Sequence, residues 1–137
     1  MKDIFEAIAN IRRLIAVPEI EQALKAKVYS NFMPPGLNEP SIVVKSLFLK
    51  NRQIQTGVFL INIHLPTIKA YGDKPYPDLI SFSALERALT QLLDERYEYS
   101  FQCWVDEVLP VNRDTDGSYY QTIRIEYNSI NTNYTNI

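Results

Sequence analysis

The sequence contains few of the residues on which common kinds of site depend. Among its 137 residues there are one cysteine, one histidine and four glycines. A single thiol, that of Cys103, cannot form an internal disulfide or a cysteine-based zinc cluster, and this usage is typical of a reducing compartment. The glycines form no phosphate-binding loop. We therefore expect no bound cofactor and no metal.

An excess of charge of one sign is also lacking. The 14 Lys and Arg are scattered among 16 Asp and Glu, for a net charge of −2. A nucleic-acid binder concentrates basic residues in a patch, so we expect no direct, sequence-specific contact with nucleic acid.

Long hydrophobic runs are missing as well. No apolar run is longer than four residues, as from Val58 to Ile61, which is far short of the roughly 20 residues that a membrane-spanning helix needs. Residues 1–17 mix acids and bases where the core of a signal peptide would be continuously apolar. We therefore expect a chain that is not exported and does not enter a membrane.

What is present is the composition of a globular protein, with 46% hydrophobic and 22% charged residues. A chain of this length fits one domain and can bury a sizeable core. We predict a single domain spanning 1–137, with a globular core at 3–129 and a flexible polar tail at 130–137.

Three stretches have helical periodicity. Residues 3–16 carry an apolar stripe behind a capping box formed by Asp3 and Glu6, and residues 19–27 predict a short second helix that begins after Pro18. The third helix begins near Ser81 or Ser83, either of which can cap it. The apolar stripes of the first and third helices comprise Ile4, Phe5, Ile8, Ile11, Leu14 and Ile15, and Phe82, Leu85, Ala88, Leu89, Leu92 and Leu93.

The remaining regular segments are β-type. A short strand is predicted at 28–32, two long strands at 41–51 and 53–65 form a tight hairpin, and a last pair covers 97–111 and 118–130. Both alternation sets are apolar near Val58, which predicts that both sheet faces are covered there. Residues 66–78 contain three prolines and one glycine and predict an irregular surface loop. The expected fold class is α+β, with helices packed on a mostly antiparallel, about five-stranded sheet.

The stretch NRDTDG at 112–117 matches the first half of an EF-hand calcium loop. Asn112, Asp114 and Asp116 stand where the first three ligands would be, and Gly117 stands at the glycine position. The twelfth position, which must supply a bidentate carboxylate, is Ile123, and both flanks are β-type. We interpret the stretch as a hairpin turn, in which Asp side chains bond to the backbone and Gly permits a positive φ.

Other chemistry-bearing residues form no motif. His64 has no neighbouring nucleophile, and the acid pairs at 94–95 and 106–107 show no catalytic spacing. Cys103, beside Trp104, is interpreted as a small buried residue. The nine tyrosines fit either strand composition or a contact surface. The alternative function is a small α+β ligand-binding domain or enzyme with a pocket near His64.

The order of the elements resembles that of a known family. A helical N-terminus is followed by VYSNFMPP at 28–35, EPSIVVKSL at 39–47, GVFLINIHLP at 57–66, FSALERALTQLLD at 82–94 and a hairpin turning on DTDG. Together these resemble the tail-completion and tail-terminator proteins of long-tailed bacteriophages and prophages. The likeness covers roughly residues 3 to 129.

The resemblance implies a non-enzymatic virion assembly protein with no catalytic residues. Such a subunit closes into a ring, commonly a hexamer, at the head-proximal end of the tail tube, where it stops tube growth and docks to the head. Its partners are other copies of itself, tail-tube proteins and head–tail connector proteins, and it moves from the host cytoplasm into the virion. The resemblance does not separate tail-terminator, tail-completion and head-closure proteins.

On this interpretation, the loop at 66–78 and the hairpin at 112–118 are expected to contact neighbouring subunits or the tube. The candidate contact residues are Tyr71, Asp73, Lys74, Tyr76, Arg113, Asp114, Asp116, Tyr119 and Tyr120.

Overall fold

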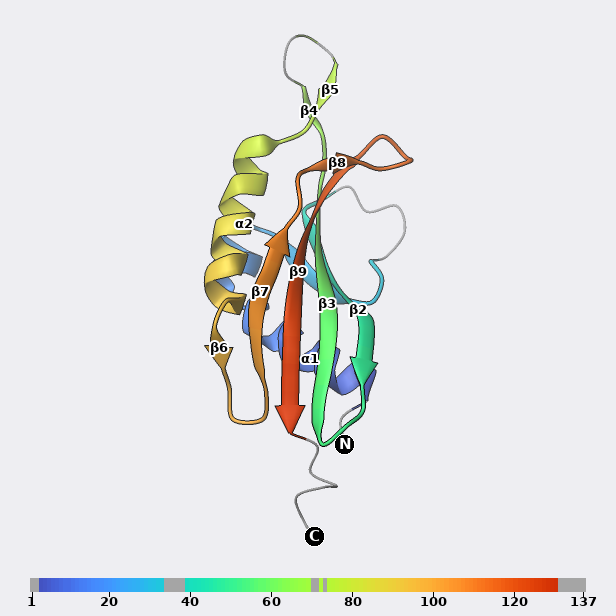
Figure 1. Cartoon of the computed structure of the whole chain (residues 1–137). Coiled ribbons are helices and arrows are strands. Elements are labelled where there is room, and N and C mark those ends of the chain that lie inside the picture. Colours follow the sequence, from blue (N-terminus) through green and yellow to red (C-terminus); the bar gives the residue numbers. More distant parts are fainter. Residues whose placement is uncertain (1–2, 34–38, 70–71, 73, 131–137) are drawn as a thin grey trace.

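The fold is a curled sheet with helices against one face (Figure 1). The computed structural model describes residues 3–33, 39–69, 72 and 74–130. Seven strands form the main sheet in the order β1-β2-β3-β9-β7-β6, with β8 paired to β9. They are β1 (Lys27–Ser30), β2 (Ser41–Lys50), β3 (Ile54–Leu65), β6 (Arg96–Tyr97), β7 (Gln102–Val108), β8 (Asn112–Arg113) and β9 (Tyr119–Ile130). The short strands β4 (Ile68–Lys69) and β5 (Pro75–Tyr76) form a separate pair.

The predicted fold class is wrong in the proportion of helix to strand and in the number and direction of the strands in the sheet. Strands make up 44% and helices 28% of the described residues, and the sheet is a seven-stranded mixed one rather than a mostly antiparallel one of about five strands. β1 runs parallel to β2, with Val28 opposite Ile42. Strand direction leaves no trace in an alternation pattern, and β6 and β8, of two residues each, are too short to show one.

Three of the four predicted long strands are as expected, but the segment predicted as one strand at 97–111 forms the separate strands β6 and β7. β2 and β3 form the predicted antiparallel hairpin, with a bulge between Ser46 and Phe48. β3 pairs along its whole length with β9, from Ile54 opposite Ile130 to Leu65 opposite Tyr119. β9 ends one residue into the predicted tail, and residues 131–137 lie outside the described part of the chain.

The first helix, α1 (Ile4–Ile15), begins as predicted. The Oδ1 atom of Asp3 accepts a hydrogen bond from the Glu6 N–H at 2.8 Å. The predicted apolar stripe begins too early, because Ile4 is exposed and Phe5 is 69% exposed. The residues that α1 buries are Ala7, Ile8, Asn10, Ile11 and Ile15.

The other two helices differ from the prediction at their ends. The second shrinks to a single π-helical turn, η1 (Glu19–Ala23), and Lys25, at a φ of 55°, marks the end of this segment. The third, α2 (Leu79–Leu93), is capped by Asp78, whose carboxylate accepts bonds from the Ser81 N–H at 3.2 Å and the Ser81 hydroxyl at 2.6 Å. Neither Ser81 nor Ser83 is the cap, because the helix already begins at Leu79.

The core lies between the helices and one face of the sheet, with Tyr127 of β9 at its centre. The Tyr127 ring meets Phe59 edge-on at 5.3 Å and stacks on Phe101 at 5.4 Å between ring centroids. Its hydroxyl accepts a hydrogen bond from Asn10 Nδ2 at 3.2 Å, and Asn10 Oδ1 accepts one from Arg13 at 2.6 Å. Burial raises the pKa of the Tyr127 phenol.

The opposite face of the sheet has no described helix over it and faces the viewer in Figure 1. Val43 and Val58 are nevertheless buried there, whereas Leu60 is half-buried. The prediction that both faces are covered therefore holds at Val58 but not along the whole strand. Neither α1 nor α2 has the length and apolar character that a bilayer crossing demands; this holds for all the helices that the structure describes.

Replacing the buried phenol should destabilise the fold. Tyr127→Phe removes the acceptor of Asn10 Nδ2 inside the core, so we expect the free energy of unfolding to fall by about 1–3 kcal/mol in urea denaturation. The matched control is Tyr99→Phe at a fully exposed tyrosine, which should change it by less than about 0.5 kcal/mol. Equal stabilities of the two variants would contradict this account of the core.

Candidate functional site

The two segments expected to make contacts lie at the same end of the molecule. β4 and β5 form a two-stranded arm that projects beyond β3, and the hairpin joining β8 to β9 lies next to the base of that arm (Figure 1). The loop at 66–78 is thus partly regular, because Ile68 pairs with Tyr76 and Lys69 with Pro75. The prediction of a wholly irregular loop was wrong.

A groove of about 510 Å³ separates the base of the arm from the hairpin. His64 contributes to it from β3, and Arg113, Asp114 and Asp116 contribute from the hairpin. The arrangement brings the only histidine of the chain next to two carboxylates that are some 50 residues away in sequence. The lining residues are Met33, Glu39, His64, Leu65, Pro66, Thr67, Pro75, Arg113, Asp114, Asp116, Gly117 and Ser118.

The His64 ring lies on the helix-free side of the sheet. It stacks on Tyr120 of β9, its partner across the ladder, with 6.0 Å between ring centroids and 30° between ring planes. Burial lowers the pKa of His64, and the charge of Lys45 lowers it further, whereas Asp114 and Asp116 raise it. Burial is the largest of these effects, so the imidazole is neutral at pH 7.

The stretch NRDTDG is a hairpin turn, as predicted. The Asp114 N–H donates to the Ser118 carbonyl at 2.7 Å, and the Gly117 N–H donates to the Asp114 carbonyl at 3.1 Å. Gly117 has a φ of 89°, which favours glycine. Ile123, the residue at the position of the bidentate calcium ligand, is fully buried in the core.

The two acids of the turn bond to their own loop. Asp114 Oδ1 accepts from the Thr115 N–H at 2.7 Å. Asp116 Oδ1 accepts from the Ser118 N–H at 2.9 Å and from the Ser118 hydroxyl at 2.6 Å. These bonds from Ser118 lower the pKa of Asp116. The carboxylates are therefore held in place by the turn.

The groove offers polar recognition rather than a nucleophile. The Ser118 hydroxyl donates to Asp116 instead of to the imidazole, so serine and histidine do not form the bonded pair that nucleophilic catalysis uses. Its three acids, Glu39, Asp114 and Asp116, outnumber Arg113, and their excess of negative charge suits a cationic group. In the described part of the chain, no cluster of three or more His, Cys, Asp or Glu is arranged to hold a metal ion.

The candidate contact residues are distributed over the arm, the hairpin and the start of β9. Lys74 and Tyr76 are exposed on the arm, and Arg113 and Asp116 are exposed on the hairpin. Tyr71 and Asp73 lie outside the described residues.

The three remaining candidates lie between the hairpin and the sheet. Asp114 is half-buried in the groove, Tyr120 stacks on His64, and Tyr119 packs against the core. Glu39 lines the same groove and was not among the candidates, because no local pattern in the sequence marks it. Its place follows from the pairing of Ser41 with His64, which only the folded sheet reveals.

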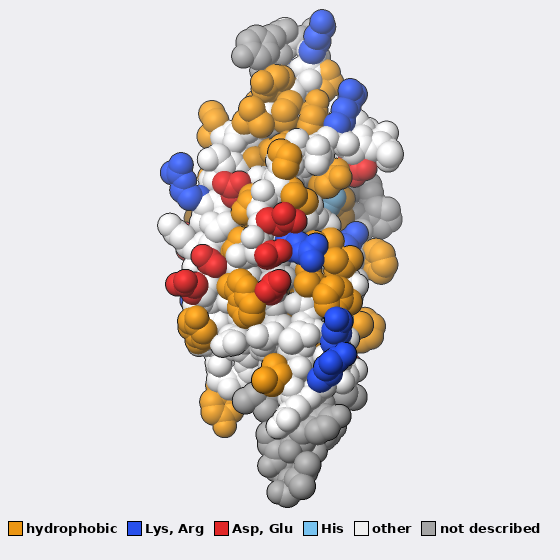
Figure 2. All heavy atoms as spheres, viewed as in Figure 1, with side chains coloured by type: hydrophobic (Ala, Val, Ile, Leu, Met, Phe, Trp, Pro, Cys, Tyr) orange, Lys and Arg blue, Asp and Glu red, His pale blue; other side chains and the backbone are white. Residues whose placement is uncertain are grey.

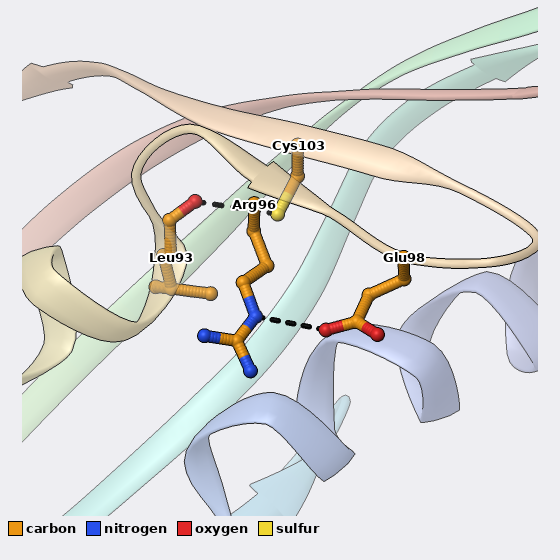
Figure 3. Close-up of polar contacts among 4 residues, drawn as sticks. All are labelled: Leu93, Arg96, Glu98 and Cys103. Atoms are coloured by element: carbon orange, nitrogen blue, oxygen red, sulfur yellow. Dashed lines mark hydrogen bonds and ion pairs between the residues drawn. The ribbon is translucent and has the colours of Figure 1, made fainter.

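Cys103 is a structural residue, as interpreted from the sequence (Figure 3). Its Sγ donates to the Leu93 carbonyl at 3.3 Å, and burial raises the pKa of the thiol to about 12. A thiol held in its neutral form is a poor nucleophile. Beside it, Arg96 and Glu98 form an ion pair at 2.8 Å.

One member of each acid pair has a structural contact. Asp94 accepts from the Val105 N–H at 3.0 Å, and Asp106 lies 3.2 Å from Arg124 Nε. Glu95 and Glu107 are exposed. These residues form no acid–base couple, because Asp94 accepts a hydrogen bond from the backbone of β7 and Asp106 pairs with Arg124 of β9.

His64 should make stability depend on pH. Its pKa in the folded chain lies below the ordinary value of 6.5, so the unfolded chain binds the proton more readily. The free energy of unfolding should therefore fall as pH drops below about 6.5. His64→Gln should remove this part of the loss while keeping all other titrations, as urea denaturation between pH 5 and pH 8 would show. A parallel loss in both proteins would refute the assignment.

The chain matches none of the models of known protein families, and a search of curated proteins also finds no match. The resemblance to phage tail proteins therefore stays a prediction. The fold, the groove and the exposed surfaces carry the functional interpretation.

Proposed function

We propose that this chain is a non-enzymatic assembly protein of a phage or prophage virion, which forms a ring at the head-proximal end of the tail tube. The observation that carries the proposal is the separation of surfaces on an elongated subunit (Figure 1). The arm and the hairpin occupy one end, and the outer strands of the sheet form the two flanks. Subunits placed side by side in a ring would meet through their flanks and present one end to the tube.

The arm end carries apolar side chains suited to a contact. Ile68 and Tyr76 are exposed on the arm, and next to it Ile80, at the start of α2, is 85% exposed. Figure 2 shows hydrophobic side chains gathered at this end of the molecule. Contiguous exposed apolar surface is characteristic of sites of protein association. The arm and the hairpin are therefore assigned to the tube, and the flanks to neighbouring subunits.

Deletion of the gene should change tail length. Without a protein that stops tube growth, the phage or induced prophage should release tails of irregular, excessive length that lack heads, measured by negative-stain electron microscopy of lysates. Supplying the wild-type chain from a plasmid should restore uniform tails. Uniform, head-bearing tails from the deletion strain would overturn the proposal.

The groove supports a second candidate, a ligand-binding function. It gathers His64 with Asp114 and Asp116, and its excess of carboxylates favours a cationic ligand. A neighbouring subunit or a tube protein can also present such a group as a lysine or arginine side chain. The groove is therefore compatible with the ring function as well.

A guanidinium probe tests the groove by itself. Arginine amide binds only the folded chain on this account, so it should raise Tm in thermal unfolding as its concentration rises. Asp114→Asn should abolish the increase because it removes a carboxylate from the groove, whereas Glu21→Gln, at an exposed acid on η1, should leave it unchanged. An equal Tm response in all three proteins would exclude the groove as the binding site.

A further inference from the structure

The two outer flanks of the sheet are only partly covered by their edge strands. β1 pairs with β2 only from Ser41 to Val44, so no described strand lies beside the outer edge of residues 45–50. β6 pairs with β7 only at Gln102 and Cys103, so no described strand lies beside the outer edge of residues 104–108 either. An uncovered strand edge is a surface with which another chain can associate.

The flanks carry opposite charge. The β2 flank, at residues 45–52, contains Lys45, Lys50 and Arg52 and no acid. The β7 flank, at residues 94–107, contains Arg96 as its only base. Figure 2 shows acidic side chains gathered over the β7 side of the helix-free face and basic ones over the lower β2 side. The acids of the β7 flank are Asp94, Glu95, Glu98, Asp106 and Glu107.

Both flanks also expose large apolar side chains. On the β2 flank Leu47 is 52% exposed, and Phe48 is exposed with the Lys50 ammonium 5.6 Å from its ring centroid. On the β7 flank Tyr97 is 75% exposed and Tyr99 is fully exposed. Tyrosine is enriched among the residues that contribute most to protein association. Each flank thus combines charged side chains with large exposed apolar ones, and interfaces use both kinds of contact.

The strand directions suit a head-to-tail arrangement. β2 is antiparallel to β3, β3 to β9 and β9 to β7, so β2 and β7 run in opposite directions. When copies are related by rotation about an axis parallel to the strands, β7 of one copy lies antiparallel to β2 of the next. The alternation within the sheet then continues from copy to copy around a closed ring.

Side chains rather than a shared backbone ladder must make most of this contact. β2 has a bulge between Ser46 and Phe48, and β7 has one between Val105 and Glu107. Asp94 also occupies the Val105 N–H, which would otherwise donate outward. Bulges and occupied donors prevent open-ended strand addition. They leave charge and apolar contact as the means of association, which favours a defined neighbour over a fibre.

We infer that the partner of each flank is a second copy of this chain, with the acidic β7 flank of one subunit against the basic β2 flank of the next. The charge complementarity of the two flanks selects this occupant over an unrelated protein. The inference deepens the proposed ring function and rests on it. It assigns the subunit interface to residues outside the arm and the hairpin.

Charge reversal tests the pairing. Lys50→Glu/Arg52→Glu reverses the β2 flank, and Glu95→Lys/Glu98→Lys/Glu107→Lys reverses the β7 flank; all five residues are exposed. In sedimentation velocity at low salt, each variant alone should associate at least about tenfold more weakly than the wild type, because like charges then face each other. Raising the salt should weaken wild-type association.

An equimolar mixture of the two variants gives the sharpest outcome. Every junction in an alternating ring then joins opposite charges again, so native mass spectrometry should recover the oligomer with equal numbers of the two variants. The matched control for the β2 variant, Lys69→Glu/Arg87→Glu, makes the same change in net charge away from both flanks and should assemble like the wild type. Circular dichroism checks that each variant is folded.

Three results would overturn the inference. The first is a wild-type oligomer that both flank variants leave intact, and the second is a mixture of folded variants that fails to reassemble. Either result removes the flank assignment but leaves the ring function, which tail length in the deletion strain tests separately. The third is a wild-type chain that stays monomeric at all concentrations, because the flanks are then too weak to hold a ring.

Discussion

The antiparallel pairing of β3 with β9 is the constraint on which the rest of the structure depends. The two strands stay in register over their whole length, and β2 then attaches to β3 while β7 and β8 attach to β9. A slip of one residue would turn Ile123, Ile125 and Tyr127 away from the core. Gly57 belongs to the same constraint, because a Cβ there would lie 2.9 Å from the Phe48 carbonyl oxygen beside the bulge of β2.

The length of this pairing also positions the groove. β3 ends at its last partner pair, Leu65 with Tyr119, and the chain continues from there into the arm, while β9 begins at the same pair after the hairpin. The pair before it brings His64 against Tyr120 on the helix-free face. The groove is thus the space that opens where the two longest strands leave each other. Its carboxylates are fixed by the short turn bonds of Asp114 and Asp116 rather than by the sheet.

Features encoded over many neighbouring residues were predictable from the sequence, and those that depend on distant pairing were not. The extents of α1, β2, β3 and β9 follow from periodicity, and the turn at 112–117 follows from Ile123, whose apolar side chain excludes a ligand role. The parallel direction of β1 and the two-residue strands leave no periodic signal. The groove likewise brings His64 close to the hairpin, which is far from it in the sequence, and no local sequence pattern indicates that the two are neighbours.

The same distinction applies to charge. Along the sequence, acids and bases are interspersed and the net charge is small, which argues against a nucleic-acid footprint. In the folded chain, residues 45–52 and 94–107 stand on opposite sides of the sheet, so a nearly neutral protein has one basic and one acidic flank. A subunit of this kind is repelled by copies in a like-to-like arrangement and attracted head to tail. In the proposed assembly the bulges of both flanks would prevent a continuous ladder, so side chains would set the contact angle, and a closed ring would leave no flank unpaired.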